Sequence, residues 1–472
     1  MAGCRPHMPG VLVIGSECGV PMVNKFVTAS AVAILLALGA AGGAQAQSIT
    51  QALTAAYDHA PDLQAALLEA KASAENIALA KSAKLPTIGA SIGGSESWSL
   101  VGGQFSGGPT ITTGVSYNQT IFDNFKTEAQ VESARAAAEL SEYQIRNSEQ
   151  NVLLSVVQAY MNVLSGRQLV ALREENIRFF QAQFQSAQDR LDVGEGTRID
   201  VAQAQARLAQ GEAAYRAALS TLEVSQATFQ RLVGVRPQQL NSAHNYARLI
   251  PNSLDSALAE AEVGHPAIMM SKAAIRAAQA GTDAAEASFG PTASVTGQVG
   301  SRWTNGGMTD GLSGSVGFQV TVPIYAGGAM GASVRKANLG QIKSEVEAMS
   351  TYDQVREAVI SAWAGIQSAD AQIQAAQAAV QAGTTVLDGT IQERDLGTST
   401  TLDVLNSQAD LTSAKEGLIN AQTSKVVATF SLLSAMGRLT ASSLGLPVTV
   451  KSAVNYTQAV EDVWQELRSV AE

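Results

Sequence analysis

Alternation of apolar and small polar residues from Gly311 to Tyr325 is the feature that most constrains the fold of this chain. From 312 to 324 the even positions carry Leu, Gly, Val, Phe, Val, Val and Ile, whereas the odd positions carry Ser, Ser, Gly, Gln, Thr and Pro. A period of two is typical of a β-strand with two different faces. One face is apolar and the other is small, polar and uncharged, so a strand of a membrane β-barrel is favoured, with lipid on one side and water on the other.

A second stretch of the same kind lies 203 residues earlier, between Thr110 and Phe122. One of its faces carries isoleucine, valine and tyrosine, and the other carries threonine, serine and asparagine. Counted along the chain, Ile121 corresponds to Ile324. Two such strands at matching places indicate that they belong to a longer internal repeat.

The repeat extends far beyond these strands. Residues of the same type recur 205 positions apart in the first part of the unit and 203 positions apart in the later part. The pairs at 205 are Pro61 with Pro266, Pro86 with Pro291, and Trp98 with Trp303; those at 203 include Asp192 with Asp395, Gly194 with Gly397, Asp200 with Asp403, and Leu208 with Leu411. Two nearly constant offsets over about 150 residues indicate an internally duplicated unit.

Each copy is predicted to contain a helix, two strands, a very long helix and a return helix. The proline-free stretch from Lys126 to Leu191 is predicted to form one helix of about 99 Å, which favours a coiled-coil-like bundle over a compact domain. The other elements of the first copy are a helix over Ser48–Lys84, a strand over Thr87–Leu100, a loop over Val101–Pro109, the strand Thr110–Phe122, a turn over Val193–Gly196 and a helix over Thr197–Val233. Those of the second copy are a helix over Pro266–Ser288, a strand over Thr292–Trp303, a loop over Thr304–Asp310, the strand Gly311–Tyr325, a long helix over Met330–Asp395, a turn at Gly397 and a helix over Thr401–Met436.

The predicted organisation therefore has five parts. Residues 1–46 form a secretory signal peptide, 47–233 the first repeat, 234–263 a linker, 264–440 the second repeat, and 441–472 a C-terminal tail with a short amphipathic stretch over Ala459–Ala471. The signal peptide is indicated by Lys25, by the apolar run that follows it, and by the cleavage pattern Ala44-Gln45-Ala46. A transmembrane anchor is the alternative, but the apolar run is shorter than the roughly 20 residues that a span needs.

Composition excludes several classes of function. The formal net charge of −10 disfavours a nucleic-acid partner. Both cysteines, Cys4 and Cys18, precede the predicted cleavage site, so thiol chemistry is not expected in the mature chain. The four histidines show no metal-ligand spacing, and we find no acid, base and nucleophile cluster. The sequence predicts no catalytic residues, no metal site and no cofactor.

Four strands per chain are too few to close a membrane barrel, since the smallest barrels have about eight. Two chains would supply eight strands, whose interior is filled by side chains, while three would supply twelve and leave room for a pore. A homotrimer is therefore favoured, and the long helices would continue the pore as an α-helical barrel. The predicted fold class is mixed α and transmembrane β, with four strands per chain joining a trimeric 12-stranded β-barrel.

These features together resemble the TolC-type outer-membrane factor, or outer membrane efflux protein, family. The resemblance is carried by the duplicated unit, by VGEGTRIDVAQAQARL at 193–208 and LGTSTTLDVLNSQADL at 396–411, and by the strand-to-helix segments YNQTIFD and VPIYAGG. It implies a homotrimeric channel in the cell outer membrane, whose helical part lies in the periplasm. The family works with a periplasmic adaptor (a membrane fusion protein) and an inner-membrane transporter, either ABC-type or proton-driven.

The resemblance implies that the chain is the exit duct of a type I protein secretion or tripartite efflux system. The lack of a cysteine after the cleavage site, where a lipid would be attached, leans slightly toward secretion. A soluble periplasmic coiled-coil scaffold is the alternative from a different class, although four strand faces suited to lipid speak against it. An envelope enzyme is a further alternative, disfavoured by the missing catalytic cluster.

Two groups of candidate site residues lie at the turns that end the long helices. The resemblance implies that these turns form the periplasmic entrance, where adaptor tips dock. The alternative is that the glycines only allow the chain to reverse its direction. The candidate docking residues are Gly194, Gly196, Thr197, Gly397 and Thr400; the candidate entrance and gate residues are Asp403, Asn406, Asp200 and Arg198.

The resemblance places an acidic ring at Asp403, and three copies would face one axis in a trimer. The family often has a second acidic residue where this chain has Asn406, and an arginine where it has Ser399, so the usual gate ion pair is altered. Helix capping is the alternative for Asp403, and the favoured reading for Asp200, because both follow a threonine by three positions.

Trp98 and Trp303 lie toward the loop ends of matching strands. Tryptophan is enriched where a barrel crosses the membrane–water interface, so these two residues are predicted to belong to an aromatic girdle in contact with outer-membrane lipid. Ordinary packing between loop and strand is the alternative.

Overall fold

The computed structural model describes residues 47–461, except 242–245 and 305–306. The chain divides into two units, Met1–Ala46 and Gln47–Glu472, and the predicted signal peptide lies outside the described residues. The helices are α2 (Ile49–His59), α3 (Pro61–Ser82), α4 (Lys126–Asp192), α5 (Arg198–Val233), the 3-10 helix η1 (Tyr246–Leu249), α6 (Leu254–Gly264), α7 (Pro266–Ala287), α8 (Ala329–Asp395), α9 (Thr401–Ala435), α10 (Ala441–Leu444) and α11 (Val454–Glu461). The strands are β1 (Thr87–Val101), β2 (Gln104–Phe122), β3 (Thr292–Thr304) and β4 (Gly307–Thr321).

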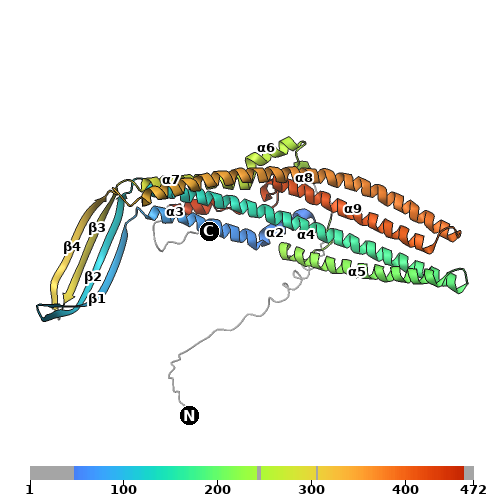
Figure 1. Cartoon of the computed structure of the whole chain (residues 1–472), viewed down its shortest axis with the longest axis horizontal. Helices are drawn as coiled ribbons and strands as arrows, with labels where there is room; N and C mark the ends of the chain where they lie inside the picture. The colour runs from blue at the N-terminus through green and yellow to red at the C-terminus, as the bar shows by residue number, and fades with distance from the viewer. Residues whose placement is uncertain (1–46, 242–245, 305–306, 462–472) are drawn as a thin grey trace, which may run out of the picture. The chain divides into compact units, whose positions relative to one another are not determined.

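The four strands form one antiparallel sheet in the order β1-β2-β3-β4 (Figure 1). Its register places apolar residues opposite one another on one face, as in the pairs Ala90 with Val115 and Val115 with Val299. The neighbouring pairs on the other face join small polar residues, as in Ser116 with Gln298. Both outer strands, β1 and β4, have one unpaired edge within the chain.

Both predicted loops between the strands are too long. The loop predicted over Val101–Pro109 is a two-residue turn at Gly102 and Gly103, which both have positive φ, at +62° and +78°. Such a pair suits the twist of a tight hairpin, and the strand continues on either side. Likewise β4 begins at Gly307, inside the loop predicted over Thr304–Asp310.

The strand predicted over Gly311–Tyr325 also ends earlier than expected. Strand β4 stops at Thr321 instead of reaching Tyr325. Pro323 lacks an N–H group and cannot donate to a ladder, and the outer edge of β4 has no neighbour here. The corresponding strand β2, which has a neighbour on both sides, continues to Phe122.

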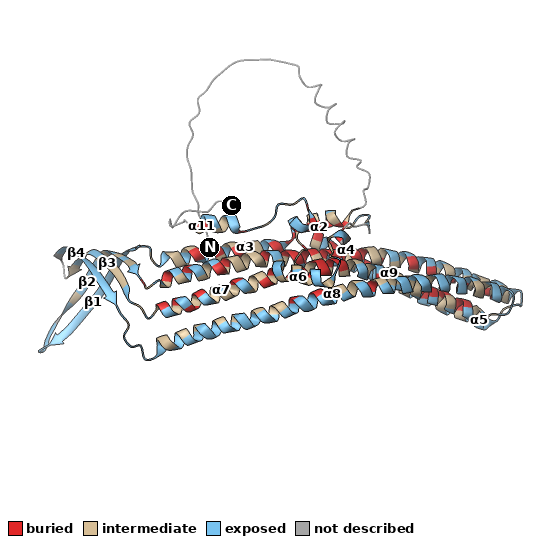
Figure 2. Cartoon of the chain, turned by 90° about the horizontal axis from the view of Figure 1, so that it is seen from above, coloured by how far each residue is buried: buried red, intermediate tan, exposed pale blue. Residues whose placement is uncertain are grey.

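The two long helices agree with the prediction to within a residue at each end. Helices α4 and α8 have 67 residues each, which is about 100 Å of helix. Each is followed by a tight turn and a return helix, α5 or α9, so the order hairpin, long helix, return helix occurs in both halves. Figure 2 shows α4 with many buried residues, whereas α8 is largely exposed. Within the described part of the chain, no helix is both long and apolar enough to span a membrane.

The largest core cluster lies at the middle of the helices, where α2, α4, α5 and α9 meet. Tyr57, Tyr160, Phe229 and Phe430 are completely buried in it. The hydroxyl of Tyr160 lies within hydrogen-bond distance of the carbonyls of Gln47, at 2.6 Å, and Asn241, at 2.7 Å, so this core also ties the start of the helical part to the segment after α5.

One prediction about the connecting segments is wrong, and two others gain detail. The helix predicted over Ser48–Lys84 is two helices, because the residue before Pro61 is held out of helical conformation. The predicted linker 234–263 contains η1 and most of α6. The tail forms the short helices α10 and α11, and most of the stretch predicted over Ala459–Ala471 lies outside the described residues.

Candidate functional site

The first hairpin tip joins α4 to α5 through a turn closed by the backbone. Gly194 has φ +85°, which a residue with a side chain rarely adopts. The N–H groups of Glu195 and Gly196 donate to the carbonyl of Arg190 at 2.8 and 3.0 Å. A Cβ on Gly196 would lie 3.0 Å from the nitrogen of Leu191, so this position is also too crowded for a larger residue. Gly194 is therefore needed for the reversal itself, whereas Gly196 is favoured at its position by close packing.

The second tip has the same construction. Gly397 has φ +80°, and the N–H groups of Thr398 and Ser399 donate to the carbonyl of Glu393 at 2.9 and 3.3 Å. The two tips are thus equivalent in backbone geometry and differ mainly in the side chains that they present.

A capping box starts each return helix. Thr197 accepts from the N–H of Asp200 at 3.2 Å, and the Asp200 carboxylate accepts from the N–H and hydroxyl of Thr197 at 3.1 and 2.6 Å. Thr400 and Asp403 make the same three hydrogen bonds at 3.2, 2.9 and 2.6 Å. The capping role considered for both aspartates therefore exists in the structure.

Asp403 differs from Asp200 in one further contact, since the hydroxyl of Ser399 donates to its carboxylate at 3.2 Å. The pKa of the Asp403 carboxyl is lowered, chiefly because the hydroxyl and N–H of Thr400 hydrogen-bond the charged form, with a smaller contribution from Ser399. Because the side chain is exposed, a persistent negative charge faces solvent at this tip.

Three contacts at the tips were not revealed by the sequence, and two of them, Arg190 with Asp395 and Arg394 with Gln183, join the two hairpins. Arg190 on α4 and Asp395 on α8 form an ion pair at 3.1 Å. Arg394, only 9% exposed, donates to the same carboxylate at 2.8 and 3.1 Å. Its remaining nitrogen donates to the side-chain oxygen of Gln183 on α4. The only sequence signal for these residues is that arginine is common in the last turn of a helix, where it faces the negative end of the dipole.

The candidate residue Asn406 takes part in another link between hairpins. Its side-chain oxygen accepts from Arg207 on α5 at 2.8 Å. Arg198, in contrast, lies exposed at the first position of α5. The structure thus brings Asn406 and Arg207 together, and Asp200 and Asp403 remain on separate hairpins, each bound to its own threonine.

Apolar packing behind the tips holds the two hairpins against each other. Phe180 and Ala187 of α4 are buried with Ala204 of α5 and Leu405 of α9. Farther along, Gln408 donates to the side-chain oxygen of Asn176 at 2.9 Å in a buried position. A buried polar contact of this kind favours one relative register of the helices.

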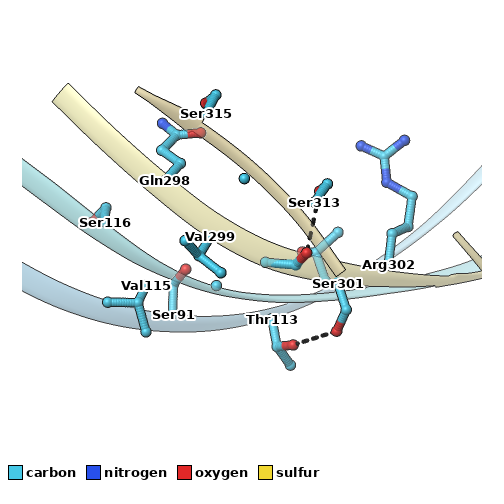
Figure 3. Close-up of a pocket in the computed structure, with 14 residues that line it drawn as sticks. Ser91, Thr113, Val115, Ser116, Gln298, Val299, Ser301, Arg302, Ser313 and Ser315 are labelled. Atoms are coloured by element: carbon cyan, nitrogen blue, oxygen red, sulfur yellow. Dashed lines mark hydrogen bonds between the residues drawn. The ribbon is translucent and has the colours of Figure 1, made fainter. Parts of the chain in front are cut away.

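The sheet at the other end has one polar and one apolar face. Figure 3 shows Gln298, Arg302, Ser313 and Ser315 on one side, lining a hollow of about 700 Å³. On the opposite face, which is otherwise mainly apolar, Thr113 and Ser301 form a hydrogen bond at 3.1 Å. A charged arginine and several hydroxyls on one face suit contact with water.

Trp98 and Trp303 both lie on the apolar face. Trp98 is 71% exposed and stacks on Phe105, with ring centroids 6.0 Å apart. It lies opposite Gly107, where any side chain would collide with the Trp98 backbone. Trp303 lies opposite Ile111 on β2. Each tryptophan is close to the turn of its own hairpin.

Comparison with known proteins gives a consistent result. The model of the family described as outer membrane efflux protein matches residues 52–235 and 257–438. The outer membrane efflux protein BepC of Brucella suis biovar 1 (strain 1330) is 38% identical over 433 residues, which cover 90% of this chain and 93% of that protein. The alkaline protease secretion protein AprF of Pseudomonas aeruginosa is 26% identical over 387 residues, which cover 78% of this chain and 79% of that protein.

The fold is also found among solved structures. The crystal structure of the Campylobacter jejuni CmeC outer membrane channel matches with a TM-score of 0.75 at 18% identity, covering 89% of this chain and 90% of that one. At this level of identity the match concerns the fold alone, which is mostly helical with one sheet.

Proposed function

The chain belongs to the outer membrane efflux protein family, and from this premise we propose that it forms a homotrimeric exit duct across the outer membrane. Its place in the cell is the outer membrane, with the helical part in the periplasm. The observation that carries the proposal is a four-stranded sheet with one apolar face and two unpaired edges. Unpaired N–H and C=O groups cannot remain exposed to lipid, so the edges must be joined by other copies of the chain.

The strand register supports a closed barrel. Trp303 on β3 lies opposite Ile111 on β2, which in turn lies opposite Gly94 on β1. Trp98, the counterpart of Trp303 in the repeat, is therefore four residues farther along β1 than the position level with Trp303. Four residues correspond to about 13.6 Å along a strand. Strands in a barrel are tilted and staggered, and a stagger of this kind brings equivalent residues to the same height. This supports the internal duplication and a common girdle for both tryptophans.

The outer surface of α8 supports assembly along the helices. Its apolar side chains Leu339, Ile342, Val346 and Met349 are exposed at spacings of three and four residues. That spacing is the seam by which helices pack together in coiled coils. Because the seam is uncovered in the single chain, we propose that a helix of the next copy covers it and continues the barrel as a helical tube of three chains.

We propose that the tips form the periplasmic entrance and dock a periplasmic adaptor, which connects the duct to an inner-membrane transporter. In this arrangement Asp403 contributes a charged ring, with Asn406, Asp200 and Arg198 around it. The contacts of Arg190 with Asp395 and of Arg394 with Gln183 hold the hairpins of one chain together at this entrance. The names of BepC and AprF include efflux and secretion respectively, so both cargo classes belong to the proposal: type I protein secretion or tripartite efflux.

Purified protein in mild detergent tests the proposal. We expect light scattering to give the mass of three chains, and planar bilayers to show discrete conducting steps. A monomer that makes no conducting steps would contradict the duct. Cross-linking during export, followed by mass spectrometry, would identify the adaptor and transporter and so decide between the two cargo classes.

A further inference from the structure

Each hairpin of the sheet enters its long helix through two residues of left-handed backbone. In the first half these are Asn124 and Phe125, with φ +55° and +65°; in the second half they are Gly327 and Gly328, with φ +60° and +82°. Asn124 corresponds to Gly327 and Phe125 to Gly328, each 203 positions apart, which is the same offset as that of the helices that follow. Positive φ is unusual for residues with side chains, so Asn124 and Phe125 need contacts that offset the strain.

The contacts of Asn124 come from the neighbouring strand entry of the same chain. Its side-chain nitrogen donates to the carbonyl of Ala287, at the end of α7, at 3.1 Å. Its side chain also fills the space beside Gly290, where a Cβ would lie only 2.1 Å from the Asn124 side-chain carbon. A large residue on the β2 side thus requires a glycine on the β3 side.

The second junction has the opposite arrangement of sizes. A Cβ on Gly327 would meet no atom within 4 Å, because β4 has no neighbour on its outer side within the chain. The residue that corresponds to Gly290 at the offset of 205 is Leu85, just before β1. Leu85 is 43% exposed, and β1 is the other open edge of the sheet.

We propose that Leu85 of one copy packs over Gly327 of the next copy where β4 meets the neighbouring β1. This inference rests on the proposed trimer and identifies a residue pair at its subunit boundary. Within one chain the large side chain of this contact is Asn124, just before the long helix α4, and the small residue is Gly290, just before β3. Between chains the large side chain is Leu85, just before β1, and the small residue is Gly327, just before α8. The exchange makes the two kinds of boundary different although the backbone is equivalent, so a junction suited to one does not fit the other.

The variant Gly327→Asn tests the pair. Asparagine tolerates left-handed backbone, as Asn124 shows, so the single chain is expected to fold. In the trimer the new side chain would occupy the space assigned to Leu85. Overpacking of this size weakens association roughly ten-fold or more per boundary. The measurement is the fraction of trimer against protein concentration in mild detergent, determined by light scattering, with circular dichroism to check folding.

Two further variants make the test specific. Gly328→Asn places the same residue one position on, where the counterpart is Phe125, and it should assemble like the unmodified chain. The double variant Leu85→Gly with Gly327→Asn reproduces the internal junction at the subunit boundary. The introduced amide can then donate to the carbonyl of Ser82, the counterpart of Ala287, and we expect the trimer fraction to recover.

The outcomes separate this inference from the proposed function. If the unmodified chain is not trimeric, the duct itself is contradicted. If the unmodified chain is trimeric and Gly327→Asn assembles equally well, or if the added Leu85→Gly brings no recovery, the proposed pair is wrong while the duct stands. Loss of assembly in Gly328→Asn as well would also overturn it, because the effect would then come from the backbone.

Discussion

At the scale of single residues, one aspartate at the second tip combines two physical roles. The carboxylate of Asp403 caps α9 through Thr400, and the same hydrogen bonds lower its pKa and keep it charged. Capping uses the oxygen atoms as acceptors, whereas a charged ring in a trimer uses the negative charge. The two roles are separable because asparagine retains an acceptor oxygen and has no charge.

Asp403→Asn is therefore expected to weaken block of the channel by multivalent cations about ten-fold, since the local concentration of cations follows the charge at the constriction. Thermal stability should change little in this variant and fall in Asp403→Ala, which removes the cap as well. Single-channel recording and thermal unfolding measure the two effects. Unchanged block in both variants would limit Asp403 to capping. Because the pKa is below its usual 3.8, the unmodified ring should stay charged until the pH falls below that value.

His265 provides a residue-scale prediction about pH. Its side chain caps α7 by accepting from the N–H of Ala267 at 3.1 Å, and burial lowers its pKa from 6.5. The unfolded chain then binds a proton at a higher pH than the folded chain, so stability falls as the pH falls below 6.5. His265→Asn keeps a capping acceptor without titrating. Between pH 7.5 and 5 the free energy of unfolding of this variant, measured in detergent, should decrease less than that of the unmodified chain. An equal decrease in both would contradict the role of His265 in the pH dependence.

At the scale of elements, the sequence predicted the long helices and the existence of four strands, because periodicity over many residues is a strong signal. The prediction missed the break before Pro61, although the residue that precedes a proline is disfavoured in helical conformation. It missed the tight turn at Gly102 and Gly103, although two adjacent glycines between alternating strands are a known hairpin pattern. Both errors were readable from local chemistry.

Contacts between elements were not readable in the same way. The ion pair of Arg190 with Asp395 and the hydrogen bond of Arg207 to Asn406 each join residues about 200 positions apart. Their existence depends on how α4, α5, α8 and α9 pack, and no local pattern specifies which turn of one helix faces which turn of another. The candidate tips were therefore predictable as turns, and the contacts between them were not.

Arg190→Ala tests the link between hairpins at this scale. The pair is partly exposed, so we expect a loss of at most about 1 kcal/mol of stability. The larger effect should be on the closed state, with a higher resting conductance in bilayers, because the hairpins separate more easily. Arg178→Ala is the matched control, since Arg178 pairs at 3.2 Å with Glu174 of its own helix. Equal conductance of the two variants would argue against a role in closure.

At the scale of the whole molecule, the single chain is incomplete in a defined way. Strands β2 and β3 have partners on both sides, whereas β1 and β4 each have a free edge. The α8 seam and the space at Gly327 lie on the β4 side of the chain, and Leu85 lies on the β1 side. Each of these open features thus belongs to one of two boundaries, which is what a head-to-tail ring of identical copies requires.

Hydrogen exchange should report this incompleteness directly. On assembly the outward-facing amides of Thr87–Val101 and Gly307–Thr321 gain partners, so their exchange should slow by roughly 100-fold or more relative to the monomer fraction. The amides of β3 are paired on both sides in the single chain and should change little. Comparison of trimer and monomer fractions in the same detergent, by mass spectrometry of peptides, measures the difference.

The core helix α4 is the control in this experiment, because Leu153, Val156, Val157 and Tyr160 are buried within one chain and this part of the helix should be protected in both fractions. If β1 and β4 were already protected in the monomer, the sheet would have to close on itself with four strands, which the lengths and pairings of the strands do not permit. If they exchanged rapidly in the trimer as well, the copies would be held by their helices alone. The barrel would then be open at its edges, and a sealed path across the membrane would have to come from other parts of the chain.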